Sequence, residues 1–161
     1  IGVRLVGSEM CIRDSLTIDP GTKAMGWALW DENKMTLCGL ARGKTWTSAV
    51  TAMPKLKVDK LIIEDQQIYR TSRIDAHSLL AVARVVGAAV AYYDFCPHLL
   101  VKPREWKGQL TKEICNQRTL ARLTEEERSL ISAALCPPSL KHNVLDAIGI
   151  GLWAIRKRRW C

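Results

Sequence analysis

Three acidic residues lie in or directly after apolar segments, where burial of a carboxylate would cost free energy. Asp19 ends the short apolar run 16–18, and Glu64 ends a second apolar run that begins at residue 60. Asp146 lies in the largely apolar stretch HNVLDAIGIGLWA. Burial of a carboxylate costs several kcal/mol unless the group is paired or bound to a metal. The chemistry that the three carboxylates could share is therefore the first question this sequence raises.

A divalent cation is the partner that three converging acids without a basic neighbour would need. Mg²⁺ prefers carboxylate oxygens and water, and three or four such ligands can hold two ions about 3.5–4 Å apart. Such a pair positions and deprotonates a water and stabilises the leaving oxygen of a phosphodiester. His142 and Asn143 precede Asp146 by four and three residues, so a helix would place both on its side.

Each acid alone also has a purely structural interpretation. Asp19 could cap the turn that begins at Pro20, Glu64 could face solvent at a strand end, and Asp146 could be satisfied within its helix. The occurrence of all three, with His142 beside the last, favours a shared site.

The elements that must position these residues are five strands and several helices. Strands are expected at residues 16–18, 26–30, 35–41, 60–64 and 98–101, and the second and third form a hairpin around a polar turn. Helices are expected at residues 46–57 (broken near Pro54), 73–95, 111–122, 124–135 and 139–158, with a basic loop from 103 to 112. This order predicts an α/β fold, a mixed five-stranded sheet with helices on both faces.

Length and composition exclude several classes of protein. The 161 residues, 48% of them hydrophobic, suit one domain with a sizeable core rather than a disordered chain. No apolar run reaches the roughly 18 residues that a membrane span needs. Six scattered cysteines without a C-x-x-C pair indicate a reducing compartment rather than a zinc site, so we expect a cytoplasmic protein. The net charge of +8 favours a nucleic-acid partner.

The first residues have a different character from the rest. The stretch VGSEMCIRDS resembles a translated sequencing-adapter tail, and it shows neither strand alternation nor a helical period. We therefore expect residues 1–15 to be non-native and residues 16–161 to form a single domain.

Three basic segments are candidates for contact with DNA. The stretch VKPREWKGQLTKE interleaves cations with an aromatic and contains Arg104, Trp106, Lys107 and Lys112. Its alternative is a solvated surface with the tryptophan as a core residue. A second stretch, QIYRTSR, contains Tyr69, Arg70 and Arg73, in which the tyrosine could stack on an unpaired base or pack under its own loop. The tail IRKRRW suits either phosphate contact or a helix C-terminus.

Four motifs together resemble one family. IDPGTKAMGWAL, LIIEDQQIY, VKPREWKGQLTKE and HNVLDAIGIGLWA are similar in order and spacing to the RuvC-type Holliday-junction resolvases, the crossover junction endodeoxyribonucleases. The resemblance covers residues 16 to about 156 and is closest to the versions carried by phages and prophages. It implies a ribonuclease H-like fold, a homodimer, a requirement for Mg²⁺ or Mn²⁺, and nicking of four-way DNA junctions.

The resemblance also implies roles for individual residues. By motif, Asp19, Glu64 and Asp146 bind metal, and Lys107 and Lys112 contact the scissile strand. Many members have Asp where this chain has Asn143, and some use His in that region. We therefore expect His142 to be the fourth ligand or the base that orients water, with Asn143 as the alternative.

The function expected from sequence is that of a Mg²⁺-dependent, structure-selective DNA endonuclease that resolves branched DNA by paired nicks. One alternative is a catalytically inactive module that binds branched DNA. The other is a nucleotide-binding protein of the actin-like superfamily, which the length disfavours because those proteins need two such lobes.

Overall fold

A five-stranded mixed sheet forms the centre of the molecule. The structure, a computed structural model, describes residues 14–67 and 75–156. The strands are β1 (Asp14–Asp19), β2 (Ala24–Asp31), β3 (Lys34–Arg42), β4 (Lys60–Glu64) and β5 (His98–Val101). They lie in the order β3-β2-β1-β4-β5, with β1–β2 and β2–β3 antiparallel and β1–β4 and β4–β5 parallel. The mixed sheet expected from the sequence is confirmed.

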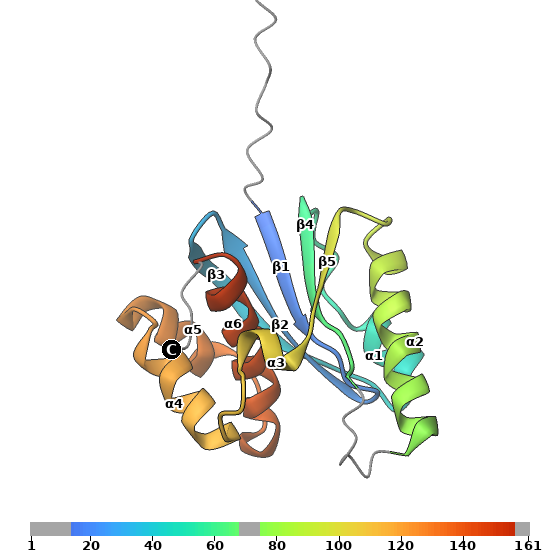
Figure 1. Ribbon diagram of the computed structural model, residues 1–161. Helices are drawn as coiled ribbons and strands as arrows, with labels where there is room; N and C mark the ends of the chain where they lie inside the picture. Colours follow the sequence, from blue (N-terminus) through green and yellow to red (C-terminus); the bar gives the residue numbers. More distant parts are fainter. Residues whose placement is uncertain (1–13, 68–74, 157–161) are drawn as a thin grey trace, which may run out of the picture.

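Helices cover both faces of this sheet. They are α1 (Trp46–Thr51), α2 (Ala76–Tyr92), α3 (Pro103–Trp106), α4 (Lys112–Ala121), α5 (Glu125–Ala133) and α6 (Lys141–Ala154), with a 3₁₀ turn at Pro138–Leu140. In Figure 1, α1 and α2 lie on one side of the sheet and α3 to α6 lie on the other. Within the part of the chain that the structure describes, no helix is long and apolar enough to cross a membrane.

Three local differences from the expected elements have clear causes. Residues 103–106 form a short helix rather than a loop, because proline suits the first helical position and the Glu105 carboxylate accepts the backbone N–H of Lys102. Helix α1 ends at Thr51 rather than at residue 57, before Pro54. Strand β1 begins at Asp14, and Ser15 pairs with Lys60, so the strand includes the last two residues assigned to the foreign tail.

Alternation along β1 and β4 sends their side chains into two separate cores. Leu16, Ile18, Leu61 and Ile63 pack with α1 and α2. Ile62 joins the other core, with α6, and Thr17 accepts a hydrogen bond from Trp30 of that core. Because side chains alternate along a strand, Asp19 and Glu64 fall on the α6 side of the sheet.

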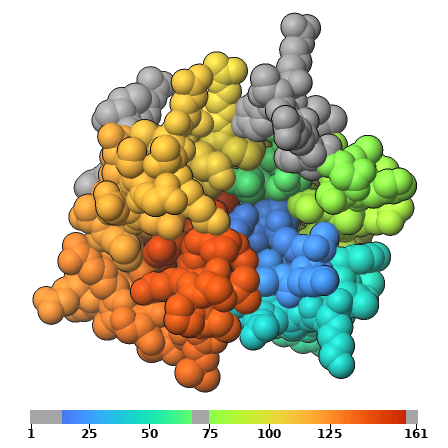
Figure 2. Space-filling view, turned by 90° about the horizontal axis from the view of Figure 1, so that it is seen from below, coloured from blue at the N-terminus to red at the C-terminus, as the bar shows by residue number. Residues whose placement is uncertain are grey.

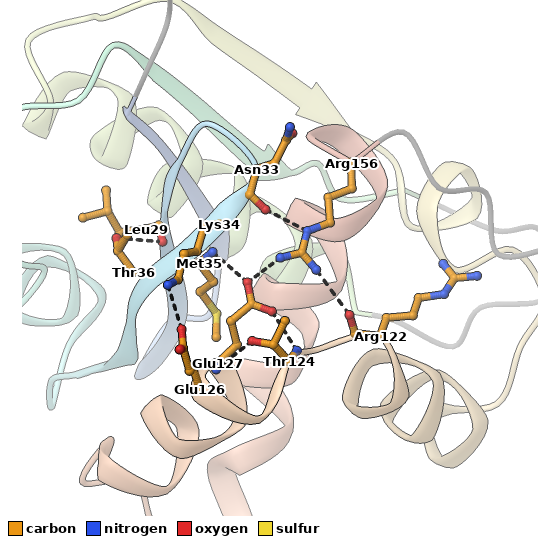
Figure 3. Close-up of polar contacts among 10 residues, drawn as sticks. All are labelled: Leu29, Asn33, Lys34, Met35, Thr36, Arg122, Thr124, Glu126, Glu127 and Arg156. Carbon is orange, nitrogen blue, oxygen red and sulfur yellow. Dashed lines mark hydrogen bonds and ion pairs between the residues drawn. The ribbon is translucent and has the colours of Figure 1, made fainter.

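A buried ion pair fastens the end of α6 to α5 and to the β2–β3 turn (Figure 3). Glu127 is completely buried and pairs with the guanidinium of Arg156. Its carboxylate also accepts the backbone N–H groups of Met35 and Thr124, at 2.9 and 3.0 Å. Burial would raise the pKa of Glu127, but these N–H groups and Arg156 outweigh it, and the pKa lies below its ordinary value of 4.5. Arg156 therefore has a structural partner in Glu127.

Replacement of Arg156 by methionine should destabilise the fold by about 3 kcal/mol at neutral pH, because it leaves the buried Glu127 carboxylate without its cation. The folded pKa of Glu127 is lowered, so the stabilisation is complete above the ordinary value and is lost as pH falls through the folded value. The free energy of unfolding that Arg156→Met loses should therefore become smaller as the pH is lowered. Urea unfolding of wild type and Arg156→Met at neutral and acidic pH measures this difference.

A matched control is the neighbouring exposed pair Lys34–Glu126, whose side chains are 65% and 77% exposed. Lys34→Met should leave the unfolding midpoint almost unchanged, because exposed ion pairs contribute little. Equal losses for the two variants would contradict the role given to Glu127.

Candidate active site

Asp19 and Glu64 are the last residues of the adjacent parallel strands β1 and β4, so they lie at the same edge of the sheet. In the parallel register Ile18 of β1 pairs with Ile63 of β4, so the two acids are the next residues along adjacent strands. Both face the α6 side. Asp19 is half-buried, and Glu64 is only 6% exposed. The structure thus brings these two predicted residues to one place.

Helix α6 brings Asp146 to the same edge because β2 has no side chain in its way. Asp19 pairs across the sheet with Gly26. A Cβ atom at Gly26 would lie 1.9 Å from the backbone oxygen of Asn143, so the first turn of α6 rests directly on β2. In Figure 2, which views this edge from below, the blue β1–β2 segment lies beside the orange-red start of α6. Sequence reasoning missed Gly26, although a glycine inside an apolar strand is a known sign of close backbone approach.

The three carboxylates lie close enough to affect one another electrostatically. Burial raises the pKa of Asp19 well above its ordinary value, and the negative charges of Asp146 and Glu64 raise it further, while Lys107 and Lys112 oppose the shift. Burial likewise raises the pKa of Asp146, against the opposing charges of Lys107, Lys112 and His142. A carboxylate cluster of this kind is strained by its own charge at neutral pH.

Among residues 14–67 and 75–156, Glu64 has two donors, and both use the same carboxylate oxygen. The indole Nε1 of Trp106 donates to Oε2 at 2.7 Å, and Nζ of Lys107 lies 3.5 Å from the same atom. Burial raises the pKa of Glu64, and these two donors limit the rise. Burial would lower the pKa of Lys107, but the charges of the three acids outweigh it, and its pKa is raised. Lys107 is thus an internal counter-ion of the cluster.

The carboxylate oxygens of Asp19, Glu64 and Asp146 are ligands that suit a hard divalent cation. Their side chains are, however, farther apart than in a formed metal site. Within residues 14–67 and 75–156, no three His, Cys, Asp or Glu side chains stand close enough together to hold an ion. The carboxylates nevertheless converge, repel one another and offer the oxygen ligands that Mg²⁺ prefers. Bound cations would offset the burial and the neighbouring negative charges that raise the pKa of Asp19.

His142 and Asn143 both lie at this edge, so the choice between them stays open. His142 is half-buried and near enough to Asp146 for its charge to lower the pKa of that acid. Asn143 is half-buried, and its backbone oxygen faces Gly26.

The predicted DNA-contacting residues differ in their exposure to solvent. Arg104 on α3 and Lys112 at the start of α4 are exposed, whereas Lys107 is half-buried against Glu64. The prediction for Trp106 is wrong: its side chain is completely buried and cannot stack on a base, so the alternative of a core residue holds. Tyr69, Arg70 and Arg73 lie outside the described residues.

Solved structures of other proteins share the fold of this chain. The chain has the ribonuclease H-like fold of Holliday-junction resolvases, which confirms the resemblance as one of structure. It is similar to the fowlpox virus Holliday junction resolvase, with a TM-score of 0.63 and 11% identity over 89% of this chain and 98% of that one.

Two further solved structures show the same likeness. Thermus thermophilus RuvC in complex with a Holliday junction substrate matches with a TM-score of 0.52 and 16% identity, over 86% of this chain and 90% of that one. The yeast mitochondrial Holliday junction resolvase matches with a TM-score of 0.54 and 12% identity, over 88% and 80% of the two chains. No protein-family model matches the sequence, and no curated protein gives a significant match.

Proposed function

We propose that this chain is a Mg²⁺-dependent, structure-selective DNA endonuclease that resolves four-way junctions or related branched DNA by paired nicks. The observation that carries the proposal is the convergence of Asp19, Glu64 and Asp146 from β1, β4 and α6 at one edge of the sheet. The solved structures with the same fold are Holliday-junction resolvases, one of them bound to its junction substrate.

The residues of the chain have distinct tasks in this proposal. Asp19, Glu64 and Asp146 would hold the cations, for which Mn²⁺ can substitute, and His142 or Asn143 would complete the set. Bound cations would supply an activated water and neutralise charge at the phosphodiester. Lys112 and Arg104, both exposed on the adjoining α3–α4 segment, would hold the DNA backbone.

Paired nicks require two such sites, and α2 offers a surface for a second copy of the chain. Its exposed face carries Leu80, Ala83, Gly87 and Ala91 at helical spacing, and Leu80 is 55% exposed. A Cβ added at Gly87 would meet nothing within 4 Å, so another helix could approach closely there. A homodimer through this face, acting in the cytoplasm, completes the proposal.

A cleavage assay tests the function and its alternatives together. The protein is incubated with a labelled four-way junction, a flap and a linear duplex, in Mg²⁺, Mn²⁺ or chelator. We expect nicks in the branched substrates only, and only with the metals. On a supercoiled plasmid that extrudes a cruciform, paired nicks should give linear DNA. Binding without cleavage would instead indicate an inactive binding module, and ATP hydrolysis in a parallel assay would indicate the actin-like alternative.

Replacement of Lys112 by alanine should weaken junction binding and reduce its dependence on salt by about one phosphate contact, because one neutralised phosphate releases one condensed counterion. Binding titrations at several salt concentrations measure the slope. Lys55 is the matched control: it is exposed in the segment before β4, at the opposite end of that strand from Glu64. A slope as steep in Lys112→Ala as in wild type and Lys55→Ala would contradict the contact.

The choice between His142 and Asn143 is expected to appear in the rate of cleavage. A neutral imidazole can bind metal or accept a proton, so His142 would support cleavage in either role. His142→Ala should lower the maximal rate, and Asn143→Ala should retain it. The reverse result would assign the fourth position to Asn143, and two active variants would mean that three carboxylates suffice.

A further inference from the structure

Trp106 connects two of the elements that carry the carboxylates. Its ring, on α3, is completely buried, and its Nε1 donates to Oε2 of Glu64 at 2.7 Å. The ring also packs against Gly149 of α6, where a Cβ would lie 2.6 Å from the ring atom Cζ3. Gly149 follows Asp146 by three residues and therefore lies on the same side of the helix. Trp106 thus touches the strand-end acid directly and the helix of Asp146 by packing.

The hydrogen bond from Trp106 to Glu64 is shorter than the contact from Lys107, although the charge of Lys107 lowers the pKa of Glu64 more. An indole N–H is a donor only, and this one belongs to a completely buried ring. The ammonium of Lys107 lies farther away, at 3.5 Å, on a flexible stem that is 30% exposed. With Oε2 held by Trp106, the other oxygen, Oε1, takes no hydrogen bond among the described residues. It is therefore the oxygen left for a cation.

We propose that Trp106 is a positioning residue that sets the affinity of the carboxylate site for divalent cations by holding Glu64 through its indole N–H. The proposal rests on the proposed function, because it presumes that the site binds a cation. Partners that hold a ligating carboxylate typically change metal affinity by about 10–100-fold when they are removed.

The test removes the N–H and keeps the aromatic ring. In Trp106→Phe, the affinity for Mn²⁺, measured by calorimetry on the protein without DNA, should fall by about 10–100-fold. The single-turnover rate of junction cleavage should fall at limiting Mn²⁺ and recover substantially at saturating Mn²⁺. This recovery distinguishes a positioning role from a direct one in the chemical step.

Trp30 provides a matched control in the same core. It is also completely buried, its Nε1 donates to a buried oxygen, Oγ1 of Thr17 at 3.1 Å, and its ring packs against a glycine of α6, Gly151. Its contacts with Thr17, Gly151 and Arg156 include none of the three acids. Trp30→Phe should therefore lose a similar amount of stability, measured by urea unfolding, and keep the wild-type affinity for Mn²⁺.

Three results would overturn the proposal. The first is wild-type Mn²⁺ affinity in Trp106→Phe, and the second is equal weakening in both variants, which would mean that only packing matters. The third is a wild-type protein that neither binds Mn²⁺ nor cuts junctions, which overturns the proposed function as well. If Trp106→Phe does not fold, benzothienylalanine incorporated at position 106 keeps the shape of the indole and lacks only the N–H, and it should show the same loss of affinity.

Discussion

Replacement of Asp146 by asparagine is expected to lower the rate of junction cleavage by roughly 10³-fold or more while junction binding stays close to wild type. The amide has the shape of the carboxylate but not its charge, so the site loses a ligand for the cations that activate water. A loss of about 4 kcal/mol in transition-state stabilisation corresponds to this factor. The exposed cations on α3 and α4 are unchanged, so contacts with the DNA backbone should persist.

Single-turnover cleavage with Mg²⁺ and gel-shift binding in chelator measure the two quantities separately. The metal-free variant should melt no lower than wild type at neutral pH, because the folded pKa of Asp146 is raised by burial and its charge therefore opposes folding there. Any gain in melting temperature of Asp146→Asn over wild type should disappear in acid, where the carboxyl of wild type is protonated in both the folded and unfolded states.

Asp65 is the matched control for this variant. It directly follows Glu64, and its backbone N–H donates to the backbone oxygen of Val101. Because side chains alternate where a strand continues, we expect the Asp65 side chain to lie on the other face of the sheet. Asp65→Asn should cut like wild type. Cleavage at the wild-type rate by Asp146→Asn would refute the site.

The second large effect is expected at Gly26, a residue with no chemistry of its own. In Gly26→Ala the new Cβ would lie 1.9 Å from the Asn143 oxygen and 2.7 Å from the Val144 nitrogen. Both are backbone atoms, so no side chain can rotate away and α6 itself must shift. Overpacking of this kind costs about 3 kcal/mol, and the shift moves Asp146 relative to Asp19. Urea unfolding should show the loss, and cleavage should fall even where the variant is folded.

Gly87 on α2 is the control for the loss of a glycine. A Cβ there meets nothing within 4 Å, so Gly87→Ala should leave the fold intact or stabilise it by up to about 1 kcal/mol through helix propensity. Equal stability of Gly26→Ala and wild type would mean that α6 does not rest on β2 as closely as the structure shows.

The order and kind of the elements could be predicted from the sequence because their signals are local. Alternating or continuous apolar runs identified all five strands, and the bounds of β4 and β5 match the expected residues 60–64 and 98–101. The capping box of Thr124 and Glu127 marked the start of α5. The acids at the ends of two apolar runs and on the last helix also followed from residue type and position.

Only the tertiary structure decided which side chains meet, because contacts between distant segments leave no periodic trace in the sequence. Trp106 and Lys107 are neighbours in a basic stretch, yet one is a buried donor to Glu64 and the other its partly exposed counter-ion. Arg156 stands in a run of cations, yet it pairs with the buried Glu127. The convergence of the three carboxylates depends in turn on the parallel register of β1 and β4 and on the absence of a side chain at Gly26. The residue types thus determined which functional groups are available. The packing of α6 and α3 against the sheet decided which of these groups lie together in one site.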